Sequence, residues 1–194
     1  MNGLDGLRFA MMPALATAAA LSTGCATIDN IAGARPRPVA VVVAPARLNP
    51  AEQAFVAAAM ARNAYEIEVS RLASERATNP RVRTYAQQLV NTQSSANNEL
   101  TRIMSARGIA PAKGLTADKA SKLRRLASLP RSAAFDEGYV RVVGIEDHTA
   151  NIALFEKARR EAADRDLLAW IDRSLDAMRR QLGVAQSLAG MIAG

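Results

Sequence analysis

Residues 49–77 read NPAEQAFVAAAMARNAYEIEVSRLASERA, and this stretch decides the fold. Asn49 is a favourable helix N-cap, Pro50 suits the first turn, and Glu52 stands at the third helical position, where it completes a capping box. Apolar residues then recur at helical spacing over the rest of the stretch. The pattern predicts a long amphipathic helix with one glutamate, Glu66, among its core positions.

Three more long segments carry an apolar stripe of the same period. We expect helices over residues 79–107, 132–163 and 166–191, with a short basic helix over residues 116–129 in the connection between the second and third. Four helices of similar length favour antiparallel packing around one core. The sequence therefore predicts an all-α domain over residues 49–194, a ferritin-like up-down-up-down four-helix bundle with a short extra helix.

The first 25 residues resemble an export signal, in which Arg8 precedes a short apolar run. The run ends in LSTGC at Cys25, which is similar to a bacterial lipobox, although Ser22 stands where the pattern has leucine. Ala26 follows the cysteine, and by resemblance to lipoprotein sorting it favours the outer membrane over the inner one. We expect an exported periplasmic protein anchored to the outer membrane by lipid on Cys25. Ordinary cleaved secretion and an uncleaved segment are the alternatives.

Residues 26–48 are rich in proline and alanine and have no helical period, so we expect a disordered tether. Pairing of Val41–Val43 as an edge strand is the alternative. Cys25 is the only cysteine, which excludes an intramolecular disulfide and any metal site built on several thiolates. Stability must therefore come from packing of the helices.

The formal net charge of +7 makes an anionic component a candidate partner. Four basic residues gather in the predicted short helix, namely Lys119, Lys122, Arg124 and Arg125. They are candidates for contact with an anionic component of the cell envelope, and a solvated helix face is the alternative. Nucleic acid is not expected, because aromatic residues make up only 4% of the chain and offer few stacking platforms.

Each long helix carries one polar residue near its midpoint, on or beside the apolar stripe: Glu66, Gln93, His148 and Gln181. In an up-down bundle, residues at the middle of each helix meet at one level. Polar side chains buried there need partners or a ligand. Arg62 lies one turn before Glu66, so an ion pair between the two is one way to satisfy the layer without a ligand.

Five segments share a pattern with a known family: FVAAA from Phe55, NAYEIE from Asn63, VRTYAQQLV from Val82, FDEGY from Phe135 and DHTA from Asp147. Together they resemble the ferritin-like bacterial envelope proteins of domain-of-unknown-function family 4142. The resemblance covers about residues 52–188. It implies a ferritin-like fold in a periplasmic or outer-membrane protein, and it brings no settled activity.

The family pattern has an Asp-His pair in the second helix, another in the third and a histidine in the fourth. In this chain the corresponding positions are Thr92-Gln93, Asp147-His148 and Gln181, and Glu66 is kept. Glutamine binds transition metals poorly. A di-iron carboxylate centre also needs more glutamates and Glu-x-x-His motifs, whereas this chain has one histidine.

We therefore expect no cofactor, and we interpret Gln93 and Gln181 as members of a polar core layer. The alternative is a weak divalent-metal site formed by Glu66, Asp147 and His148. Adjacent helical residues such as Asp147 and His148 point about 100 degrees apart, which weakens that alternative.

The function predicted from the sequence is that of a non-enzymatic structural or interaction module with a degenerate ferritin-like centre. A metal-binding or redox protein is the alternative. A hydrolase built on His148 lacks a nucleophile in a recognisable turn, so no catalytic residues are assigned. The sequence assigns no oligomeric state.

Overall fold

The computed structural model describes residues 47–111 and 114–192. The predicted signal segment with Cys25, and the predicted tether up to residue 46, lie outside the described residues. Within the two described ranges every regular element is helical. None of these helices is both long enough and apolar enough to cross a membrane.

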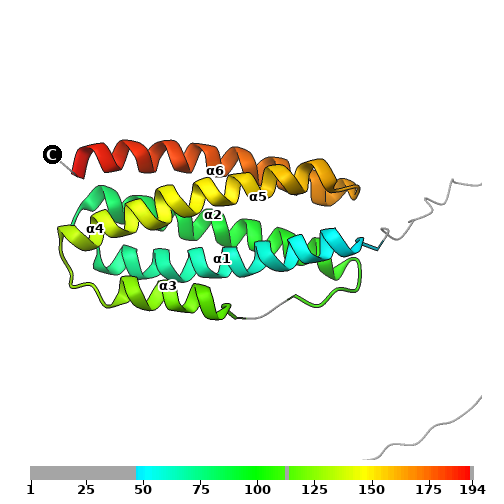
Figure 1. Cartoon of the computed structure of the whole chain (residues 1–194), viewed down its shortest axis with the longest axis horizontal. Coiled ribbons are helices and arrows are strands. Elements are labelled where there is room, and N and C mark those ends of the chain that lie inside the picture. Colours follow the sequence, from blue (N-terminus) through cyan, green and yellow to red (C-terminus); the bar gives the residue numbers. More distant parts are fainter. Residues whose placement is uncertain (1–46, 112–113, 193–194) are drawn as a thin grey trace, which may run out of the picture. The chain divides into compact units, whose positions relative to one another are not determined.

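The chain forms a helical bundle (Figure 1), and the predicted helices agree with it to within two residues except in the third. The elements are α1 (Pro50–Arg76), α2 (Pro80–Ser105), α3 (Ala117–Ala127), α4 (Ala133–Tyr139), the π-helix η1 (Val140–Asp147), α5 (His148–Glu161) and α6 (Arg165–Ile192). The capping box of α1 is confirmed, since Asn49 and Glu52 exchange hydrogen bonds of 2.8 and 2.9 Å. Gly108 has a φ of 68°, as expected for the glycine after α2.

Two apolar clusters form the core. One is centred on Phe55, Phe155 and Trp170, and the other on Tyr85 and Tyr139. Gln93, His148 and Gln181 each fall between the stretch of their helix that joins the first cluster and the stretch that joins the second. In α1 the change of cluster comes between Met60 and Tyr65, and Glu66 directly follows Tyr65. The polar residues therefore form a layer that separates two apolar halves of one bundle. Helix α3 lies outside this bundle, against α1 (Figure 1).

The prediction of one uninterrupted α-helix over residues 132–163 is wrong at its centre, where η1 is a π-helix. Two contacts account for this geometry. A Cβ on Gly144 would lie 2.7 Å from the Cβ of Ala185, so the missing side chain lets η1 approach α6 closely. Nδ1 of His148 lies 2.8 Å from the carbonyl oxygen of Val143, five residues earlier. Such π-turns often occur at functional sites, and this one adjoins the polar layer.

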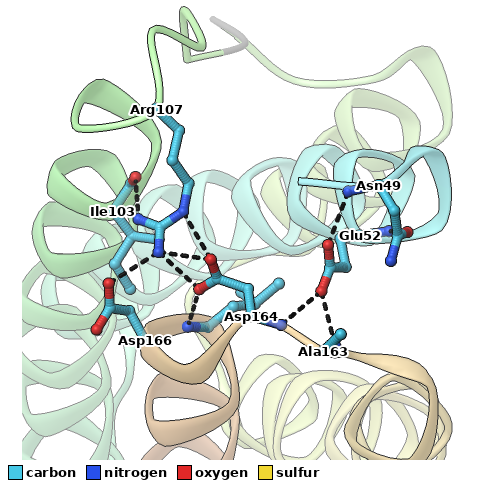
Figure 2. Close-up of polar contacts among 8 residues, drawn as sticks. Asn49, Glu52, Ile103, Arg107, Ala163, Asp164 and Asp166 are labelled. Atoms are coloured by element: carbon cyan, nitrogen blue, oxygen red, sulfur yellow. Dashed lines mark hydrogen bonds and ion pairs between the residues drawn. The ribbon is translucent and has the colours of Figure 1, made fainter. Parts of the chain in front are cut away.

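One end of the bundle is held together by a cluster of carboxylates and one arginine, which we call the end latch (Figure 2). Arg107, just beyond α2, donates to both oxygens of Asp164 at 2.6 to 2.9 Å and to Asp166 at 2.8 Å. Glu52 accepts from the amides of Ala163 and Asp164 at 2.8 and 2.9 Å. The latch thus joins α1 and the end of α2 to the start of α6.

These contacts make the contribution of Glu52 to stability depend on pH. Burial raises its pKa, but hydrogen bonds from the amides of Asp164, Asn49 and Ala163 outweigh burial and lower the pKa below the ordinary value of 4.5. The ionised form is therefore favoured in the folded state. Its contribution to stability is present above the unfolded pKa and is lost as the pH falls through the lower folded pKa.

We expect Glu52→Gln to lower the free energy of unfolding by about 1–2 kcal/mol at pH 7. The difference from the unaltered protein should shrink as the pH falls from the unfolded pKa through the lower folded pKa, because the carboxyl is protonated first in the unfolded state and then in the folded state as well. Urea denaturation at a series of pH values measures this difference. Glu68→Gln is the matched control, because Glu68 is exposed and pairs only with exposed Arg71. A difference that stays constant from pH 7 to pH 3 would contradict the prediction.

Candidate functional site in the buried polar layer

The four residues predicted to form the polar layer lie at one level of the bundle. Glu66 and His148 are fully buried, Gln93 is 3% exposed, and Gln181 is half-buried. They come from α1, α2, the start of α5 and α6, respectively. Polar side chains in such a position must find partners within the layer.

Arg62 supplies the charge partner of Glu66. Its Nη2 lies 2.7 Å from Oε2 of Glu66, and the two side chains are 4% and 0% exposed. Nη1 of Arg62 donates to the side-chain oxygens of Asn63, at 2.9 Å, and of Gln93, at 3.4 Å. The guanidinium also lies over the ring of Phe155, 5.4 Å from its centroid. Contacts on several sides therefore hold the arginine in one position.

His148 completes the layer on the side of η1 and α6. Nδ1 donates to the Val143 carbonyl, which can only accept, and it lies 3.4 Å from Oε1 of Glu66. Nε2 lies 3.2 Å from the side-chain oxygen of Gln181. The ring is thus oriented by protein groups on both nitrogens.

The Asp147 carboxylate faces α3 and not Glu66 or His148. Its Oδ1 lies 2.7 Å from Nζ of Lys122 on α3, where it fastens α3 to the bundle. Lys119 lies nearby with its Nζ 4.9 Å from the centre of the Tyr65 ring. Burial, followed by the charge of Asp147, raises the pKa of Tyr65. Of the three predicted metal ligands, the structure brings Glu66 and His148 together and directs Asp147 towards α3.

Two tyrosines line the neighbouring apolar half. Burial raises the pKa of Tyr85 and of Tyr139, so both phenols stay protonated and act as hydrogen-bond donors or acceptors. The Tyr85 hydroxyl donates to the backbone carbonyl of Gln181 at 3.3 Å, and the Tyr139 hydroxyl shares a 2.8 Å hydrogen bond with Ser70. The Ser70 hydroxyl is therefore engaged with a phenol.

The layer does not fit a di-iron carboxylate centre. Such a centre takes a glutamate from each of two helices and Glu-x-x-His from two others. Here one carboxylate and one imidazole meet side-chain amides, and the guanidinium of Arg62 already pairs with the carboxylate. Across residues 47–111 and 114–192, no three side chains of the His, Cys, Asp and Glu types gather as a metal-binding group.

The sequence reasoning missed Asn63, which is a buried member of the layer, and Asn151, which is a second buried asparagine. Asn63 accepts from Arg62, and it precedes Glu66 by three residues. Asn151 follows His148 by three residues. Residues three apart share a helix face, so this spacing is the signal that could have identified both.

The four basic residues predicted as an anionic-partner surface fall into two groups. Lys119 and Lys122 contact the bundle, as described above. Arg124 and Arg125 are exposed, and neither forms an ion pair with another described residue. Arg125 borders a hollow of about 360 Å³ between α3 and η1, whose other lining residues include Lys122, Leu126, Leu129, Arg141 and Glu146. Of the four predicted residues, Arg124 and Arg125 are therefore the exposed ones.

Comparison with known proteins supports the fold and the family. The family model described as "Domain of unknown function (DUF4142)" matches residues 37–188. A crystal structure of a DUF305 fragment from Deinococcus radiodurans is similar, with a TM-score of 0.67 and 16% sequence identity. The similarity covers 75% of this chain and 99% of that one. At this identity the likeness shows the fold alone. No curated protein matches the chain.

The family model spans well over half of the chain, from within the predicted tether through nearly all of α6. The resemblance noted in the sequence is thereby confirmed: the chain belongs to the DUF4142 family.

Proposed function

We propose that this protein is a non-enzymatic, exported module of the bacterial cell envelope, in which a tethered helical bundle presents the α3 surface to an anionic partner. We also propose that the bundle has the ferritin-like up-down-up-down arrangement with a degenerate centre. The export signal and the lipid on Cys25 are proposed from the sequence of residues 1–25. Lipid on Cys25 would hold the bundle at the outer membrane through the tether.

The observation that carries the proposal is the contrast between the two sets of charges. In the polar layer, the buried carboxylate and guanidinium neutralise each other. On α3, Arg124 and Arg125 are exposed and have no carboxylate partner among the described residues. Buried charge is thus satisfied within the protein, whereas positive charge at the surface remains available to attract anions.

The test is binding of the chain from residue 26 onward, which lacks both the signal segment and the lipid, to vesicles with and without phosphatidylglycerol. We expect binding to the anionic vesicles that weakens as salt is added. Replacing both arginines, Arg124→Glu and Arg125→Glu, should weaken it about tenfold or more, because each cation near an anionic surface contributes roughly 1 kcal/mol. Co-sedimentation measures the bound fraction.

The matched control is the double variant Arg160→Glu and Arg180→Glu. Both arginines are exposed, lie on α5 and α6, and form no ion pair with other described residues. The change in net charge is the same, so an equal loss of binding would assign the effect to overall charge and contradict a role for α3. If neither double variant changes vesicle binding, the proposed surface is contradicted as well.

A further inference from the structure

A hollow of about 300 Å³ lies between the first turns of α1 and the end of α5. Most of its lining is apolar and includes Ala54, Phe55, Ala58, Leu154, Ala158 and Leu167. Leu154 is 38% exposed there. Of the charged lining residues, Glu52 belongs to the end latch (Figure 2), and Lys157 lies 4.0 Å from Glu161. The charges in the lining thus have partners within the protein, and the hollow suits an uncharged, apolar occupant.

The described part of the chain begins close to this hollow. Leu48 is buried and belongs to the same apolar cluster as Phe55 and Leu167, which line the hollow. The Leu48 carbonyl accepts a hydrogen bond of 2.7 Å from Nε2 of Gln53, which fixes the backbone just before α1. The preceding residues are therefore joined to the bundle next to an apolar surface.

The sequence before Leu48 matches the hollow in chemistry. Residues 38–46 read PVAVVVAPA and carry no charge, although Arg37 and Arg47 flank them. The family model matches from residue 37, so this stretch belongs to the unit that the family model describes together with the bundle. Valine side chains gain free energy when they leave water. A spacer gains nothing from such a run of valines, whereas a docked segment does.

The length of this segment fits the hollow as well. The hollow follows α1 from Ala51 to Ala58, which is roughly 10 Å along the helix axis. Residues 42–47 span up to about 20 Å when they are extended. The segment is therefore long enough to turn back at Leu48 and to cover the hollow from one end to the other.

We infer that residues 42–46, which read VVAPA, dock in the hollow between α1 and α5 and cover Leu154 and Phe55 with valine side chains. Docking makes these residues part of the folded domain, so the tether ends at residue 41. This inference goes beyond the proposed function and is independent of the α3 surface. A failure of vesicle binding would therefore leave it standing.

Disulfide formation tests the docking in the full chain carrying Cys25→Ser, so that only introduced thiols react. Leu154→Cys is combined with Val42→Cys in one variant and with Val43→Cys in another, because successive side chains of an extended segment point to opposite sides. We expect one of the two pairs to form an intramolecular disulfide at least about tenfold faster than its control, since docking raises the effective concentration of the thiols. Non-reducing electrophoresis during mild oxidation measures the rates.

The matched control replaces Leu154→Cys by Val184→Cys in both pairs. Val184 is likewise an exposed apolar residue, but it lies on α6 and does not line the hollow. Equal rates for the Leu154 and Val184 pairs would overturn the inference. Disulfides that form only between chains would overturn it too, because a second copy would then cover the hollow.

A second measurement needs no introduced cysteine. Val42→Asp combined with Val43→Asp should lower the melting temperature of the full chain by roughly 3–6 °C, because the docked apolar contacts are lost. Ile28→Asp combined with Ile31→Asp makes the same kind of change outside the family match and should shift the melting temperature by less than about 1 °C. Equal melting temperatures of the two double variants would mean that residues 42–46 do not dock.

Discussion

Replacing Arg62 by methionine should lower the free energy of unfolding by about 3–5 kcal/mol, the loss typical of breaking a buried ion pair from one side. The reason is that Glu66 is fully buried and pairs with Arg62 at 2.7 Å. Without the guanidinium, an uncompensated charge remains in the core. Urea denaturation in EDTA measures the loss.

A second substitution distinguishes the contribution of the ion pair to stability from that of side-chain packing. If Glu66→Leu is added to Arg62→Met, both charges are gone, and much of the lost stability should return because apolar residues can replace a buried pair at little cost. Removing the exposed pair of Arg71 and Glu68 in the same two steps serves as the control and should change stability by less than about 1 kcal/mol. Additive losses from Arg62→Met and Glu66→Leu would contradict direct pairing.

Replacing Asp136 by alanine should lower the free energy of unfolding by about 2–4 kcal/mol, because several donors would lose a charged acceptor together. Asp136 is 2% exposed and lies on α4. Its carboxylate accepts from the amide of Thr78 at 3.0 Å, from the Thr78 hydroxyl at 2.6 Å and from the amide of Asn79 at 2.7 Å. These groups immediately precede α2, so Asp136 joins α4 to the start of α2.

Asp118→Ala is the control for Asp136→Ala. Asp118 is also an aspartate in the first turn of a helix, α3, but it is exposed and forms no salt bridge with a described residue. Its replacement should change the free energy of unfolding by about 0.5 kcal/mol or less. Equal losses from the two variants, in urea denaturation, would mean that the contacts to Thr78 and Asn79 do not stabilise the fold.

The helices were predictable because local chemistry determines where they begin and end. Asn49-Pro50 and Asn79-Pro80 are N-cap signals, and the structure starts α1 and α2 at those prolines. The π-helix was not predictable, because it depends on partners from elsewhere in the chain. Periodicity reports which face of a helix is apolar, whereas η1 results from the close approach of Gly144 to Ala185 on α6.

Only part of the candidate site could be predicted, again because local spacing is visible in the sequence and long-range contacts are not. The mid-helix positions of Glu66, Gln93 and His148 placed them at one level, and the ion pair with Arg62 followed from a spacing of four residues. The direction of Asp147 could not be predicted, because it depends on where α3 docks and on Lys122 meeting it there. The role of Asp136 was missed, since its partners lie 57 and 58 residues away in sequence.

The central claim is that the protein's own arginine, not a metal, stabilises the buried carboxylate of the polar layer. The most direct measurement is the free energy of unfolding of the unaltered chain in EDTA and in excess Zn²⁺, by urea denaturation. We expect the same value in both, since Arg62 already neutralises Glu66. A value that falls in EDTA by more than about 1 kcal/mol, with the difference removed by Glu66→Gln, would contradict the claim and identify a metal as the missing partner.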